Sequence, residues 1–208
     1  MEFKFMLDVP LEKFSYFIAS HPVLVLTSRL GRHNTLCPLT WYLPLSCDPP
    51  MLGISLKPSS QSYHSIRETG EFLLAVPPDY MAKAVHFCGL HSGRDMDKLR
   101  YLNYTAYRAK EVSPLRVAGC MAYIECRVRE ITKCGNRPFL SAEVISLYVD
   151  PRYADEEGWF DDVVFIHYLG GSQYRVGDEI VDLSAYRPGY IPPDSIGMDF
   201  GKIDLDLH

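Results

Sequence analysis

Small polar side chains, with a few cations, gather in the first third of the chain, along two expected strands and their loops. Serine, threonine and asparagine supply hydroxyl and amide groups that donate and accept hydrogen bonds, and a lysine attracts phosphate. This set suits a neutral polar ring system that carries a phosphate, although ordinary turns use the same residue types. Its members are Asn34, Thr35, Thr40, Ser46, Asp48, Ser55, Lys57, Ser59, Ser60 and Ser62.

Three other patterns carry weaker chemical signals. His86, Cys88 and His91 are close in sequence, but structural zinc usually takes four ligands in two pairs, and no second pair is nearby. We therefore expect no metal site. Cys47 lacks a local nucleophile signature and is expected to act as a small hydrophobic residue. Gly170–Gly171 does not form the glycine pattern of dinucleotide-binding units.

Composition limits the class of protein. The 208 residues suffice for one well-buried domain, and 47% of them are hydrophobic. A net charge of −5 disfavours a nucleic-acid or anionic membrane partner. No apolar run reaches the length of a membrane helix, the N-terminus does not read as a signal peptide, and the 6 cysteines contain no CxxC pair. We expect a cytoplasmic protein with free, buried thiols that binds neither nucleic acid nor membrane.

Hydrophobic patterning predicts short strands, hairpins and short helices. In residues 122–131 apolar side chains alternate with Glu125, Arg127 and Arg129, which are expected to face water. Ser62 is a possible N-cap of a short helix that ends before Gly70. This order of elements predicts a mainly β protein built on a β-barrel with helical decoration. Strands are expected over residues 22–29, 35–43, 51–56, 71–77, 122–131 and 137–150, and short helices over 11–20, 62–70, 79–90 and 95–103.

Several separated motifs resemble the flavin reductase-like family, the FMN-binding split barrels that include flavoredoxins. Residues 22–77 resemble its pattern of T(S/T)R, N-x-x-P-x-S/T-W-F-x-P-x-S-x-D-P-P, S-x-x-P-S and I-R-E-T-G-E-F. Later, "VHFCGLHSGRDMDKL" is similar to C-G-x-x-S-G-R-D-x-D-K, and "IHYLGGSQY" to H-L-G-G-x-x-Y. The match covers about residues 20–175, and the shared order of the motifs makes it specific.

The resemblance implies a homodimeric split β-barrel that holds FMN near the dimer interface. The implied activity is that of an oxidoreductase, which passes electrons from NAD(P)H or a protein donor through flavin to a small-molecule or protein acceptor. Flavin reductases, ferric reductases and flavoredoxin-like carriers fit this description, and the alternative is a non-catalytic flavin-binding or sensory module. The domain is expected over residues 1–177, and residues 178–208 are expected to form an acidic extension rich in proline and aromatics.

The same match implies a set of cofactor-binding residues. The backbone of Ser46, Cys47 and Asp48 would border the isoalloxazine ring, held by the Pro49–Pro50 corner. The flavin would be lined by Asn34, Thr35, Pro38, Thr40 and Trp41, and the phosphate approached by Ser55, Leu56, Lys57, Ser60 and Ser62.

Ser92, Asp95 and Lys98 would border the flavin from either subunit, although Arg94 and Asp95 could instead pair with each other or cap the next helix. His167 is the candidate catalytic residue, the alternative being a buried histidine bonded to a carbonyl. Many relatives carry arginine where this chain has Ser60, so Lys57 or Arg29 would have to compensate at the phosphate.

Overall fold

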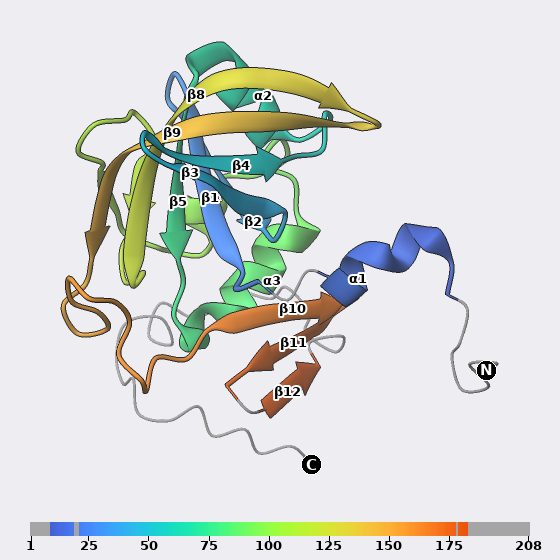
Figure 1. Cartoon of the computed structure of the whole chain (residues 1–208), viewed down its shortest axis with the longest axis vertical. Coiled ribbons are helices and arrows are strands. Elements are labelled where there is room, and N and C mark those ends of the chain that lie inside the picture. Colours follow the sequence, from blue (N-terminus) through green and yellow to red (C-terminus); the bar gives the residue numbers. More distant parts are fainter. Residues whose placement is uncertain (1–8, 19–20, 178, 183–208) are drawn as a thin grey trace.

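The computed structural model describes residues 9–18, 21–177 and 179–182, and within them strands predominate (Figure 1). The main sheet has seven antiparallel strands in the order β2-β1-β5-β8-β9-β4-β3. Their bounds are Leu24–Leu30 (β1), His33–Leu39 (β2), Tyr42–Cys47 (β3), Pro50–Ser55 (β4), Glu71–Val76 (β5), Ala122–Cys134 (β8) and Arg137–Val149 (β9).

The two edge strands of this sheet, β2 and β3, are consecutive in the chain. Only Thr40 and Trp41 separate them, so the sheet must curl until its edges meet at these two residues, here called the seam. Because all six pairings are antiparallel, β2 and β3 point in the same direction, and the chain runs on from one edge to the other. The result is the predicted mainly β split barrel. The single strand predicted over residues 35–43 is wrong in one respect. The segment forms two strands, of which the first pairs with β1 and the second with β4, at opposite edges of the sheet.

Short turns close the hairpins that build the sheet. Gly31 has a φ of 61° in the turn between β1 and β2, and Gly135 has a φ of 57° between β8 and β9. Glycine adopts this left-handed conformation at no steric cost, whereas most residues do not. The β3–β4 turn uses Asp48 and Pro49 instead.

Alternate residues of the central strands enter two different cores. On β5, Phe72 and Leu74 join Leu26 and Ile54 in one core, while Leu73 joins a second core with helix α3 (Ala82–Leu90). A strand buried on both faces reads as a continuous apolar run rather than as an alternating one. This explains why residues 72–76, "FLLAV", form an uninterrupted apolar run.

Short helices decorate the barrel, as predicted. Helix α2 (Gln61–Thr69) begins after Ser60, whose Oγ accepts a hydrogen bond from Tyr63 N at 3.1 Å, and ends at Gly70. Ser60 is therefore the N-cap, and the assignment of Ser62 to that position is wrong. The other helical segments are η1 (Leu11–Lys13), α1 (Phe14–Ile18), η2 (Asp79–Met81), α3 (Ala82–Leu90) and α4 (Lys98–Tyr101).

Two smaller sheets complete the described chain. Strands β6 (Ala106–Arg108) and β7 (Leu115–Val117) form a hairpin, and β10 (Ile166–Gly170), β11 (Gln173–Val176) and β12 (Glu179–Asp182) form the other sheet. Because β12 pairs with β11, ordered structure continues past residue 177 into the segment predicted as an extension. The remainder of that segment, residues 183–208, lies outside the described residues.

Glu125 on β8 does not face water, contrary to the alternating pattern. Its side chain has an exposed fraction of 0%. Oε1 accepts hydrogen bonds from Lys110 N and Tyr148 Oη, both at 2.8 Å, and Oε2 accepts from Glu111 N at 2.6 Å and Val112 N at 3.1 Å. The β-bulge beside Glu125 has its extra residue, Ile145, on β9, so the alternation of β8 continues, and Glu125 is buried because the loop over residues 110–112 covers its face of the strand. The carboxylate thus anchors the loop over residues 110–112.

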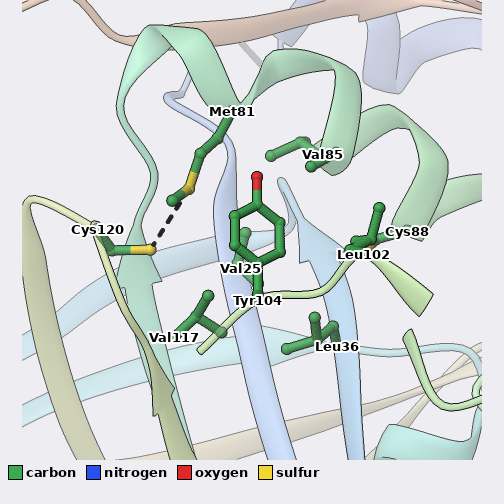
Figure 2. A pocket seen from close by; sticks show the side chains of 10 residues that line it. Val25, Leu36, Met81, Val85, Cys88, Leu102, Tyr104, Val117 and Cys120 are labelled. Carbon is green, nitrogen blue, oxygen red and sulfur yellow. Dashed lines mark hydrogen bonds between the residues drawn. The ribbon is translucent and has the colours of Figure 1, made fainter. Parts of the chain in front are cut away.

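A small apolar cavity of about 20 Å³ lies between helix α3 and the sheet (Figure 2). The Cys120 thiol donates a hydrogen bond to the Met81 sulfur at 3.9 Å on one side of it. Burial raises the pKa of both Cys88 and Cys120 to about 12, so both remain thiols at neutral pH. The prediction of buried thiols is confirmed here, but Cys47 and Cys134 are exposed.

Candidate functional site

Buried hydroxyl groups connect strands β1 and β2 with helix α2. Ser28 Oγ lies 2.7 Å from Thr35 Oγ1, which in turn lies 3.0 Å from Ser62 Oγ. The Ser62 hydroxyl also hydrogen-bonds to Cys37. The structure therefore brings together Thr35 and Ser62, two residues of the predicted site, and adds Ser28 and Cys37, which the sequence reasoning missed.

Asn34, next to this chain of hydroxyls, carries an unsatisfied acceptor. Its Oδ1 is buried and has no hydrogen-bond partner among the described residues. A buried polar atom without a partner costs free energy, so such an atom at a predicted ligand position points to a donor supplied from outside the chain.

The turn over residues 92–95 packs against the same part of β2. His33 Nε2 hydrogen-bonds to Gly93 O at 2.7 Å, and a Cβ added to Gly93 would lie 3.2 Å from Thr35 Cγ2. The absence of a side chain at Gly93 lets the turn that contains Ser92 and Asp95 pack against Thr35 and Gln61. The cap of the next helix is Asp97, whose carboxylate accepts from Arg100 N, rather than Asp95.

The Lys98 side chain is buried against β2 and does not point into solvent. Its Nζ donates hydrogen bonds to Leu36 O at 2.8 Å and Cys88 O at 2.6 Å. Burial lowers the pKa of Lys98, because the charged form loses hydration. Its ammonium thus links an edge strand to the end of α3, and direct contact with a cofactor stays a prediction.

Two further cations, like Lys98, lie near Cys37 of β2. Lys57 follows β4 and Arg137 begins β9, and with Lys98 they lower the pKa of the Cys37 thiol, although burial dominates and raises it. The Arg137 guanidinium lies 4.3 Å from the centre of the Trp41 ring. Among the described residues, no ion pair joins Lys57 or Arg137 to a carboxylate. These cations are therefore available to an anion.

Arg29 does not supply the compensating charge that the sequence suggested for the phosphate. Its Nε donates to Gly31 O at 2.9 Å and its Nη1 to Ser113 O at 3.5 Å. These bonds hold it at the β1–β2 turn. Arg137 approaches Cys37 and the seam instead, and no motif marked it, since only the pairing of β9 with β4 brings it there.

The seam itself holds several predicted residues. Thr40, Trp41 and Pro38 are half-buried, and Ser55 N donates to Trp41 O at 3.0 Å. Leu56 is buried in the core beneath, and Phe14 of α1 contacts the Trp41 ring. This part of the predicted site is thus assembled at the junction of the two sheet edges.

The remaining predicted residues lie elsewhere in the structure. Ser46 and Cys47 end β3 and Asp48 follows, so they lie at the opposite end of that strand from Trp41, up to about 20 Å away at the rise of an extended strand. His167 lies on β10, opposite Arg175, at the other end of the molecule from α2 (Figure 1). The structure therefore does not bring these four residues to the cluster around Thr35.

No helix within the described ranges is long and apolar enough to span a membrane. His86 and His91, weighed above as metal ligands, have other partners: His86 Nδ1 lies 3.2 Å from Tyr174 Oη, and His91 Nδ1 lies 2.9 Å from Phe87 O.

Comparisons with known proteins agree with this fold. An FMN-binding protein from Thermus thermophilus, solved with bound 1-cyclohex-2-enone, is 23% identical, with a TM-score of 0.74 over 84% of this chain and 96% of that one. A flavoredoxin from Methanosarcina acetivorans is 22% identical, with a TM-score of 0.70 over 93% and 99%. These likenesses concern the fold.

Among curated sequences, an uncharacterized protein of Archaeoglobus fulgidus is 32% identical over 115 residues, which are 55% of this chain and 65% of that one. The chain spans 60% to 65% of the length of the curated relatives described first. A family model, however, matches residues 17–171, which include the barrel, the seam, and Asn34 with the hydroxyls of Ser28, Thr35 and Ser62, here called the Asn34 cluster. The chain therefore belongs to the flavin reductase like domain family.

Proposed function

We propose that the protein binds FMN at the seam and acts as an oxidoreductase that passes electrons from NAD(P)H, or from a protein donor, to an acceptor. The observation that carries this proposal is the buried Asn34 Oδ1 without a partner among the described residues, one residue before the buried hydroxyls of Thr35, Ser28 and Ser62. Lys57 and Arg137, which approach Cys37 on the same strand, have no carboxylate partner among the described residues. A flavin offers ring N–H groups to such an acceptor and a phosphate to such cations. The FMN-binding protein and flavoredoxin of the same fold support this assignment.

The residues present fit the two ends of this cofactor. Asn34 and Thr35 would hold the polar edge of the ring, while Lys57 and Arg137 would neutralise the phosphate. Ser60 Oγ already accepts a bond from Tyr63 N, so its hydroxyl hydrogen remains to be donated to a phosphate oxygen. Trp41 offers an aromatic face beside the ring.

When bound, FMN supplies the redox chemistry, taking up two electrons from the donor and releasing them to the acceptor. The chain contributes binding, orientation and a fixed field of dipoles and cations. Cys37 stays protonated at neutral pH because burial raises its pKa. It therefore acts as packing and as a weak hydrogen-bonding group rather than as a nucleophile.

A homodimer is part of the proposal. Strand β3 is an edge strand, and Leu43 and Leu45 on it are 44% and 42% exposed. An open edge with apolar side chains is a surface that a second strand or chain covers. Light scattering should give about twice the 23.7 kDa chain mass, and a monomer with full FMN occupancy would refute the interface.

We also propose a cytoplasmic location, where thiols stay reduced.

An anaerobic visible spectrum with FMN, followed by NADH and then NADPH, tests the function. Bound flavin that bleaches with a nucleotide, faster than free flavin does, would establish a reductase. Bound flavin that stays oxidised would favour a protein-fed carrier or a module without turnover, and dithionite would then show whether it can be reduced. No flavin binding would refute the proposal.

A further inference from the structure

A groove of about 500 Å³ lies between the tip of the β8–β9 hairpin and the start of helix α2. Its volume falls in the range of small-molecule binding sites, roughly 300–1,000 Å³. One wall is the hairpin tip, and the other is the segment at Pro58 and Tyr63. In Figure 1 the hairpin passes across α2, and its tip projects beyond the body of the barrel.

The groove combines positive charge with an aromatic ring. Lys133 and Arg137 line it, no carboxylate does, and Tyr63 contributes its ring. The nearby Glu130 is bonded to the Thr132 hydroxyl at 3.0 Å. Neither Lys133 nor Arg137 has an ion-pair partner among the residues described. Two unneutralised cations beside an aromatic side chain suit a ligand that carries a phosphate and a planar ring.

Arg137 connects this groove with the seam. It lines the groove, and its guanidinium also lies over Trp41. A ligand in the groove would therefore adjoin the proposed flavin without occupying the Asn34 cluster. An extended dinucleotide has this shape, with one ring at the flavin and its adenosine at a distance.

We propose that the groove binds the adenosine end of the electron donor, and that Lys133 recognises a 2′-phosphate, so that the donor is NADPH. This inference rests on the proposed function. A phosphomonoester carries about −1.5 to −2 charges at neutral pH, and the ammonium of Lys133 would pair with it, while Arg137 stays with the proposed flavin phosphate. The adenosine of NADH lacks this group and would leave Lys133 without a partner.

Calorimetry with two non-reacting fragments tests the inference. Adenosine diphosphate ribose and its 2′-phosphorylated form differ only in the phosphate, and neither carries nicotinamide. With FMN-loaded protein, the phosphorylated fragment should bind at least about tenfold more tightly, as expected for a charge-assisted contact. Lys133→Gln should remove about tenfold of that affinity and leave the unphosphorylated fragment unchanged, while Lys133→Arg should retain most of it.

Lys83→Gln is the matched control, because it removes the same charge from an exposed position on α3. Equal affinities for the two fragments, or an unchanged affinity in Lys133→Gln, would overturn the assignment. So would displacement of the fragment by FMN, since the groove would then belong to the cofactor site. Failure of the proposed function is seen separately, as an absence of FMN binding by absorbance, and the same titrations on the flavin-free chain then still test the groove.

Discussion

Replacing the buried Glu125 by glutamine should destabilise the protein far more than a surface substitution does. The carboxylate accepts four hydrogen bonds, three of them from consecutive backbone N–H groups of the loop over residues 110–112. Glutamine keeps the shape but offers one acceptor oxygen and one NH₂ group, which can only donate.

The magnitude follows from where that NH₂ group is placed. In place of Oε1 it meets Lys110 N and Tyr148 Oη, and the tyrosine hydroxyl can turn to accept, so one backbone donor is left unpaired. In place of Oε2 it meets Glu111 N and Val112 N, and two donors are left unpaired. An unpaired buried donor costs about 1–3 kcal/mol, and the two bonds that remain lose their ionic partner. We expect a loss of about 3 kcal/mol.

Urea unfolding measures this loss directly, and thermal unfolding should show a fall of about 6–12 °C for a chain of this size. Glu130→Gln is the control, because Glu130 is exposed on the same strand and bonds only to Thr132 among the described contacts. That variant should stay within about 0.5 kcal/mol of the wild type. A Glu125→Gln protein within about 1 kcal/mol of the wild type would show that the carboxylate is not the anchor inferred here.

Three other substitutions test the site and its support. Lys57→Ala should weaken FMN about tenfold more than riboflavin, which lacks the phosphate, and equal losses in parallel titrations would move the phosphate elsewhere. Cys47→Ala should keep flavin affinity within about twofold, because the side chain is exposed and the proposed contact is through the backbone; a colourless protein would contradict this. Burial lowers the pKa of Lys98, so between that pKa and about 10.4 the unfolded chain binds a proton that the folded chain does not. Stability from this group then rises with pH, and urea titrations should show wild type gaining on Lys98→Met in alkaline buffer; a constant difference would refute it.

Local patterns were sufficient for much of the fold. The apolar runs of β1 and β5, the hairpin turn at Gly31 and the helix stop at Gly70 each express a backbone or burial preference within a few residues. The N-cap was misplaced by two positions, because Ser60 and Ser62 are both good caps and only the start of the helix distinguishes them. The burial of Glu125 depends on donors from a loop that a strand pattern does not contain.

The candidate site was only partly predictable for a similar reason. Asn34, Thr35 and Trp41 lie within one motif, so a resemblance over that segment identifies them together. Arg137 comes about a hundred residues later and reaches Trp41 only through the pairing of β9 with β4. Lys98 matched a motif, yet its ammonium is taken up by two backbone carbonyls, which only the packing of α4 under β2 reveals.

The run from β2 through the seam to β3 has a consequence for the accuracy of folding. Its first half pairs with β1 and its second half with β4, on opposite edges of one sheet. A slip of one residue in either hairpin would turn that half inside out. Because only Thr40 and Trp41 separate the halves, such a slip would also drag the other half out of place. The register of each hairpin therefore constrains the register of the other. A single residue inserted at the seam would remove this constraint and leave both hairpins intact.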